Sequence, residues 1–230
     1  MNTMTRRITN ETLYERVQEL RERLNQATND LGHEPNNDVG VARIMYVMEA
    51  LAIFLRLGSG TKDMVHTNAE EPQVVPFPME PCPGQVFPCP FLVSHLPRTG
   101  YLGSVVSTLS AVAAYNMGVA CHRQSFVCSN YSECAQLQLC ARQFYKTAYH
   151  LLDRLCYISP HGSLIQVYLA LCTNLAEMEF EDGNVDASRA WRGALTNTMA
   201  YVPDGPSDAS QHFRDTCVFY AFETPAAKPA

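Results

Sequence analysis

Four cysteines and a histidine gather in one short stretch of the sequence, and their types suggest chemistry most directly. They are Cys121, His122, Cys128, Cys134 and Cys140. Thiolates and imidazole are ligands that zinc prefers, but a structural zinc site usually contains at least one pair of cysteines separated by about two to four residues. The successive cysteines here are separated by six, five and five residues. We therefore expect no metal site, and we expect these side chains to be small, buried and apolar.

The nine cysteines also bear on the redox environment. A secreted protein usually pairs its cysteines in disulfides, whereas an intracellular protein usually keeps them reduced. The count is odd, and Arg6 and Arg7 near the N-terminus are not followed by the apolar core of a secretory signal. These observations predict reduced thiols and an intracellular protein, either cytoplasmic or nuclear.

A thiol-based catalytic site is the other chemistry that the residue types allow. His150 and Asp153 would share one face of a helix, and Cys156 lies near His161 in the sequence. The chain has no glycine-rich phosphate loop, no H-E-x-x-H pattern and no G-x-S-x-G pattern, so nothing ties these residues to a reaction. We predict a protein that is not an enzyme and has no cofactor. A metal-binding or thiol-based regulatory protein or enzyme is the alternative.

Charge and hydropathy exclude two further classes. The 230 residues contain 17 basic and 23 acidic side chains, for a formal charge of -6, and no run of Lys or Arg provides a footprint for nucleic acid. Residues 99–122 contain no charged side chain, and such a stretch is long enough to cross a membrane. Glycine, serine, threonine and asparagine dilute its apolar character. We expect an inner helix that its neighbours cover, and no membrane span.

The helices that must position these residues can be placed from apolar periodicity and from caps. We expect them at residues 10–32, 39–57, 99–122, 132–158, 163–182 and 185–201, with a loop at residues 124–132 and a short segment near residue 213. The first has a continuous apolar seam made of Leu13, Val17, Leu20, Leu24, Ala27 and Leu31. This seam predicts packing against the next helix, or alternatively a dimerising coiled coil.

Eight prolines between Thr61 and Arg98 interrupt the series of helices. Proline lacks a backbone N–H and biases the residue before it to an extended conformation, so no regular helix is expected. Apolar side chains, among them Phe87, Phe91 and Val93, accompany these prolines. We expect a strap whose second half lies against the helices, although such a segment could also be a polyproline ligand for another protein.

Two stretches repeat each other. Ala114-Tyr115-Asn116-Met117-Gly118 is echoed by Cys172-Thr173-Asn174-Leu175-Ala176. Each is followed by small residues around an aromatic, namely Ala141, Tyr145, Ala148 in the first case and Ala187, Trp191, Ala194 in the second. Small residues at these offsets let two helices approach closely while the aromatic fills the space between them. The pattern predicts a helical hairpin that is used twice.

These motifs, together with the Gly183-Asn184 turn, resemble tetratricopeptide (TPR) repeats. Residues 88–222 resemble, more narrowly, a group of uncharacterised TPR-like proteins of diatoms. The first unit departs from the family pattern, because Ala141 follows Gly118 by 23 positions where a TPR hairpin uses about 12. Ala176 also stands where the family has a helix-packing glycine. With only two units, the N-terminal hairpin and the last helix are expected to cap the stack.

The resulting fold class is all-α, with antiparallel helical hairpins stacked as a short TPR-like solenoid, an N-terminal helical pair and a proline-rich extended strap. Residues 1–58 are expected to form the N-terminal hairpin and residues 59–100 the linker or strap. Residues 101–222 are expected to form the TPR-like region, and residues 223–230 a flexible tail.

The resemblance implies that the first helix of each pair lines a concave groove for a peptide. The residues turned toward it would be Val112, Tyr115, Asn116, Val119, His122, Ala170, Thr173, Asn174, Glu177 and Phe180. The two asparagines lie where many TPR proteins hold a peptide backbone, and an amide suits this role because it both donates and accepts. Alternatively, each asparagine bonds a neighbouring helix or loop of its own chain.

We therefore expect an adaptor or scaffold that binds an extended peptide of another protein. The groove positions include no Lys or Arg, so chaperone carboxylate tails are not the expected ligand. Acidic residues near the end of one helix favour a neutral or basic peptide, unless they form only a solvated face; they are Glu177, Glu179, Glu181, Asp182 and Asp186. A homodimer through the N-terminal helix is the second expected interaction.

Overall fold

The polypeptide alternates long helices with one extended region, as seen in a computed structural model that describes residues 10–33, 38–58, 72–79, 87–97, 102–156, 162–202 and 211–217. The helices are α1 (Asn10–His33), α2 (Asp38–Gly58), α3 (Leu102–Val127), α4 (Tyr131–Cys156), α5 (Leu164–Glu181) and α6 (Val185–Met199). The strands are β1 (Gln73–Pro76) and β2 (Phe91–His95), and a short helix covers residues 211–217. The predicted all-α class is confirmed, apart from this small sheet.

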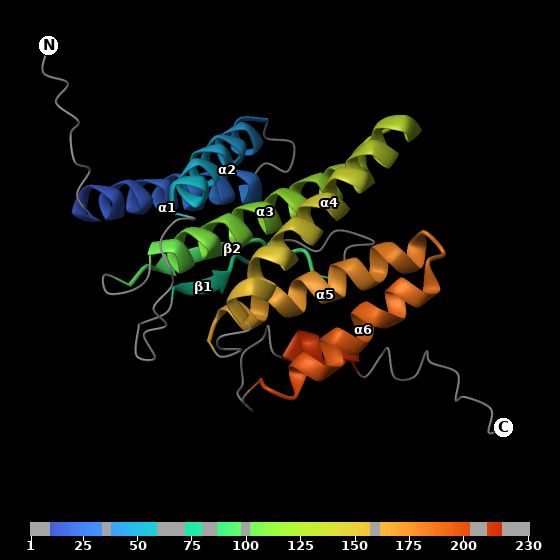
Figure 1. Ribbon diagram of the computed structural model, residues 1–230. Helices are drawn as coiled ribbons and strands as arrows, with labels where there is room; N and C mark the ends of the chain where they lie inside the picture. The colour runs from blue at the N-terminus through green and yellow to red at the C-terminus, as the bar shows by residue number, and fades with distance from the viewer. Residues whose placement is uncertain are drawn as a thin grey trace, which may run out of the picture.

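Each helix packs against the next one in the sequence, from the α1–α2 pair through α3 and α4 to α5 and α6 (Figure 1). Helix α3 lies at the centre and also contacts α1, α5 and β2. It is the one described helix that is long and apolar enough to cross a membrane, and 83% of that stretch is buried inside the protein. Its lack of charge is thus accounted for by the neighbours that surround it.

The seam of α1 is used within the chain. Val17, Leu24 and Ala27 are completely buried in the core that α1 shares with α2 and α3. Of the two roles predicted for this seam, the structure shows packing against the next helix of the same chain. A dimer contact on α1 would have to use a different face of the helix.

The loop predicted at residues 124–132 is shorter in the structure, where it comprises residues 128–130. Helix α3 continues to Val127, α4 begins at Tyr131, and the two form a long hairpin whose tip projects beyond the other helices (Figure 1). The extra residues of the first unit thus lengthen both helices, because no proline or glycine interrupts them. Asn130 caps α4, since its Oδ1 accepts hydrogen bonds from the backbone N–H groups of Ser132 and Glu133, at 3.0 and 3.4 Å.

The proline-rich region contains a sheet that the sequence analysis did not predict. Strands β1 and β2 pair antiparallel, with Val74 opposite Val93 and Pro76 opposite Phe91. Prolines at the strand ends remove donors that a neighbouring strand would otherwise have to satisfy. The prolines indicated extended backbone but not its pairing, because pairing depends on a partner strand that is distant in the sequence.

Candidate functional site

The side chain of Asn116 is the centre of the candidate site. It projects from α3, is completely buried, and holds one residue of β2 by both of its main-chain groups. Its Oδ1 accepts a hydrogen bond from the N–H of Phe91 at 2.8 Å, and its Nδ2 donates to the carbonyl oxygen of Phe91 at 2.8 Å. The second Nδ2 hydrogen is satisfied by Thr28 Oγ1 of α1 at 2.9 Å. All the hydrogen-bonding capacity of the amide is directed at its own chain.

Asn174 makes the equivalent contact from α5. It too is completely buried, and it accepts from the N–H of Phe87 and donates to the carbonyl oxygen of Phe87, each at 3.0 Å. The two repeated asparagines of the sequence therefore hold the same extended segment, at two residues, Phe87 and Phe91, that are four positions apart. Of the two alternatives weighed for these residues, bonding within the chain is what the structure shows. Binding of a peptide from another protein stays a prediction.

A third asparagine completes the series, and the sequence analysis missed it. Asn25 of α1 accepts from the N–H of Val93 and donates to its carbonyl oxygen, each at 2.9 Å. One signal could have revealed it, because Asn25 and Thr28 adjoin the apolar seam residues Leu24 and Ala27 and so lie at its buried edge. Three helices from different parts of the chain thus grip one extended segment, residues 87–97, through asparagine amides.

Aromatic rings fill the space between these amides. The ring of Phe91 lies 5.2 Å from that of Tyr115, and the ring of Phe87 stacks at 4.8 Å on Phe213 of the short helix at residues 211–217. Burial holds the pKa of the Tyr115 hydroxyl well above its usual range, and the neighbouring Tyr145 acts in the same direction. The hydroxyl therefore stays protonated and donates to the carbonyl oxygen of Phe87 at 3.4 Å. The side of the segment that carries Phe87 and Phe91 is thus covered by the rings of Phe213 and Tyr115.

Strand β1 pairs with the other edge of the segment. Successive residues of a strand direct their N–H and C=O groups to opposite sides, so the side away from the asparagines faces β1. On that side Pro90 has no N–H, and its carbonyl oxygen accepts from the N–H of Phe77 at 2.7 Å. At the N-terminus of α5, Ser163 Oγ in turn accepts from the N–H of Val74 at 2.8 Å. The edge of the segment that faces away from the asparagines is thus paired with β1, and β1 is in turn held by α5.

The other predicted groove residues divide into three groups. Val112, Val119, Ala170 and Thr173 are buried, and Thr173 Oγ1 donates to the carbonyl oxygen of Leu169 within its own helix, at 2.9 Å. His122 is buried between α3 and α4. Glu177 is half-buried, and Phe180 is exposed beneath the guanidinium of Arg192, whose carbon lies 5.1 Å from the ring centre. Of the predicted residues, Tyr115, Asn116 and Asn174 are the ones with hydrogen bonds to residues 87–97 among the described contacts.

The acidic residues near the end of α5 are largely paired within the chain. The buried Glu179 accepts hydrogen bonds from Lys146 Nζ and Asn184 Nδ2, each at 2.9 Å, and Arg142 contacts Asp182. Burial acts to raise the pKa of Glu179, but the hydrogen bonds outweigh it and hold the pKa below its usual value. These contacts tie α4 to α5.

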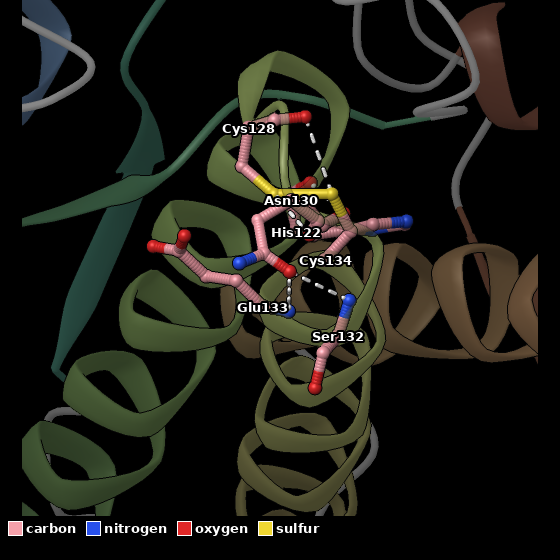
Figure 2. Close-up of a disulfide and its surroundings, with 7 residues drawn as sticks. His122, Cys128, Asn130, Ser132, Glu133 and Cys134 are labelled. Atoms are coloured by element: carbon pink, nitrogen blue, oxygen red, sulfur yellow. Dashed lines mark hydrogen bonds between the residues drawn. A yellow bond between two sulfur atoms is a disulfide. The ribbon is translucent and has the colours of Figure 1, made fainter.

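Two of the cysteines are not reduced, which corrects the sequence prediction for this pair. Cys128 and Cys134 form a disulfide across the tip of the α3–α4 hairpin (Figure 2). The lengthened hairpin brings them together, with their Cα atoms 5.9 Å apart. Within the described part of the chain, no group of three or more His, Cys, Asp or Glu side chains could hold a metal ion. Cys121 is a free thiol, and burial, with Cys140 nearby, raises its pKa to about 11.

The residues of the imagined thiol site show no shared pocket. His150 and Asp153 are both exposed on α4. The side chain of Cys156 and all of His161 lie outside the described residues. A catalytic site would require these side chains to converge in a pocket, whereas the two described members of the set face solvent.

His122 provides a prediction on pH. Burial, with the positive charge of Arg142, lowers the pKa of His122 from 6.5 to about 4. Between pH 6.5 and about pH 4, His122 is protonated in the unfolded chain but stays neutral in the folded chain. The free energy of unfolding should therefore fall as the pH drops from 6.5 toward 4 and then level off. Urea unfolding across this range measures the effect. The variant His122→Phe should lose this component, whereas His150→Phe on the exposed face of α4 should keep it; equal pH profiles for wild type and His122→Phe would contradict the assignment.

Comparison with known proteins adds no further information on this geometry. No protein-family model, curated protein or solved structure matches the chain. The function must therefore be argued from the contacts themselves.

Proposed function

We propose that this protein is a non-catalytic adaptor that binds an extended segment of another protein in a TPR-like groove. The observation that carries the proposal is the paired contact of one asparagine amide with both main-chain groups of one residue, made three times along residues 87–97. In the described structure these asparagines hold a segment of their own chain. A partner segment would take its place.

The chemistry of these contacts suits recognition of a peptide backbone. A side-chain amide that donates to C=O and accepts from N–H of the same residue satisfies an extended main chain without regard to its side chains. It therefore acts as a substitute for a neighbouring strand. Selectivity would come from the buried positions that Phe87, Phe91, Val93 and Leu96 now fill.

The proposed partner segment is neutral and apolar at alternating positions, with proline between them. This pattern follows the segment that the groove holds now. Three of the five carboxylates that could have attracted a basic peptide are engaged, since Glu179 is paired with Lys146, Asp182 with Arg142, and Asp186 with Arg189 at 3.1 Å. A basic tail would have to displace these internal partners.

The finer fold assignment, a short TPR-like solenoid, is part of the same proposal. It is supported by the close approach of α3 and α4, where Gly118 faces the ring of Tyr145 and where Ala141 and Ala148 are completely buried. In this proposal the α1–α2 pair and the helix at residues 211–217 cap the two ends, and residues 72–79 and 87–97 belong to the strap; the rest of the predicted strap, within residues 59–100, lies outside the described residues. Capping elements are needed because two repeat units leave two open faces.

The test is whether the groove accepts an outside segment. The probe is a fluorescent peptide with the sequence of residues 86–97, in which serine replaces Cys89. Wild type should bind it weakly, because its own segment competes at high effective concentration. The variant Phe91→Ala weakens that internal competitor, so it should bind the probe at least roughly tenfold more tightly, and the peptide should raise its melting temperature. Fluorescence anisotropy and thermal unfolding measure the two effects.

A matched peptide separates backbone recognition from simple apolar adhesion. Methylation of the amide nitrogen at the position of Phe91 removes the donor to Asn116 and leaves the side chain intact, so this peptide should not bind. If Phe91→Ala does not fold alone, Val93→Ala offers a milder change at the next gripped residue. Failure of the probe to bind any folded variant, or equal binding of the methylated peptide, would refute the proposed function.

A further inference from the structure

The outward face of α2 carries a stripe of exposed apolar side chains. Val39, Tyr46 and Ile53 are 56%, 54% and 57% exposed. They are seven residues apart, so they lie along one line of the helix, as the contact positions of a coiled coil do. The inward face, with Ile44 and Leu51 completely buried, is committed to the core.

The residues around this stripe are symmetric about Tyr46. Three positions before it stands Arg43 and three after it Glu49; four before it stands Ala42 and four after it Ala50. Seven positions away, Val39 and Ile53 form the outer pair. A helix with this arrangement is complementary to a copy of itself that runs in the opposite direction.

We propose that α2 docks against α2 of a second copy of this chain, antiparallel and across a two-fold axis at Tyr46. Val39 then faces Ile53 of the other copy, and the small side chains Ala42 and Ala50 face each other and permit close approach of the helices. Such a contact is isologous, because the same patch serves both copies.

Charge selects the antiparallel direction. In that direction each Arg43 faces Glu49 of the other copy, which gives two ion pairs across the axis. A parallel pair would instead bring the two copies of Arg43 together and the two copies of Glu49 together, and like charges in contact disfavour association. Arg43 is also paired with Asp30 of its own chain, and a guanidinium has enough donors for both carboxylates.

The shape of the surface agrees with this pairing. A shallow hollow lies where α1 meets α2, and its lining includes Val39, Ala42 and Tyr46. The side chain of Ile53 from the second copy, which lies opposite Val39, would enter it. Within the same chain, the guanidinium carbon of Arg23 lies over the ring of Tyr46, 5.4 Å from the ring centre. This contact holds in place the tyrosine through which the two-fold axis would pass.

This contact is separate from the peptide groove. The groove is formed by α1, α3 and α5 around residues 87–97, whereas the stripe is on the solvent side of α2. The dimer therefore does not depend on the proposed function, and one can fail without the other. It also differs from the dimer expected from the sequence, which used the seam of α1.

Charge reversal on the full-length chain tests the pairing, with sedimentation velocity over a concentration series as the readout. Wild type should show concentration-dependent dimers. Glu49→Arg places two arginines together at each end, so the dimer should weaken by at least about tenfold. Arg43→Glu should do the same, and the double variant Arg43→Glu/Glu49→Arg should restore dimers. Glu133→Arg, at the exposed tip of α4, is the control and should behave as wild type does.

Mixing provides the decisive arm. When the Arg43→Glu and Glu49→Arg chains are combined, every facing pair is of opposite charge, so heterodimers should form although neither chain dimerises alone. Wild type that remains monomeric at all concentrations overturns the proposal. Dimers that Glu49→Arg leaves intact, or single variants that stay apart when mixed, overturn it equally.

Discussion

Replacement of Asn116 by leucine should lower the free energy of unfolding by about 4 kcal/mol, because the N–H and C=O of Phe91 would both be left buried without a partner. Leucine fills a similar volume, so the loss reports the hydrogen bonds more than a cavity. Thr28 would also lose the donor that its hydroxyl now accepts from. Urea denaturation followed by circular dichroism measures the change.

A matched control is available on α6. Asn197 is exposed, and the same substitution there should change stability by less than about 0.5 kcal/mol. Hydrogen exchange adds a local readout, since the amide of Phe91 should lose most of its protection in Asn116→Leu. A variant as stable as the control would show that the amide contacts contribute little, and the argument for backbone recognition would fail with them.

Substitution of Gly118 by alanine should destabilise the protein by about 3 kcal/mol, because the added methyl carbon would lie 2.5 Å from two ring carbons of Tyr145. Both partners are held in the core: Tyr145 is completely buried, and the backbone of Gly118 lies in the middle of α3. Neither side can therefore yield at low cost. Thermal unfolding should show a clearly lowered midpoint.

Gly193 of α6 undergoes the same chemical change with the opposite expected sign. A methyl group there meets no atom within 4 Å, and alanine favours helix, so Gly193→Ala should stabilise the protein by up to about 1 kcal/mol. The comparison removes helix propensity as an explanation for the first result. If Gly118→Ala were neutral or stabilising, the close approach of α3 and α4 would not be as described.

The helices were predictable because their signals are local. Periodic apolar residues and caps predicted both ends of α1 and of α2 to within one residue. The Gly183-Asn184 turn lies between the end of α5 and the start of α6, as expected. Gly183 has a positive φ of 74°, which is the conformation that glycine adopts most readily. Repetition of Asn116 and Asn174 identified two of the three residues that hold residues 87–97, since the two asparagines occupy equivalent positions in similar helices.

The remaining parts depend on distant partners. Strand β2 forms because β1, α1 and α3 together satisfy its main chain, and no local pattern records that. Asn25 was missed because it belongs to no repeated motif. The loop before α4 was predicted too long because the extra residues of the first unit were expected in a loop, whereas they lengthen both helices. The disulfide is possible because the longer hairpin brings Cys128 and Cys134 to its tip.

The order in which the chain is synthesised adds a consequence of these three asparagine contacts. Residues 87–97 are synthesised after α1 but before α3 and α5, which supply two of the three asparagines: Asn174 lies 87 residues after Phe87, and Phe213 later still. Contacts between such distant positions form slowly, because long loops must close first. During synthesis the apolar segment is therefore exposed without Asn116 and Asn174, and the nascent chain should depend on chaperones until α5 emerges.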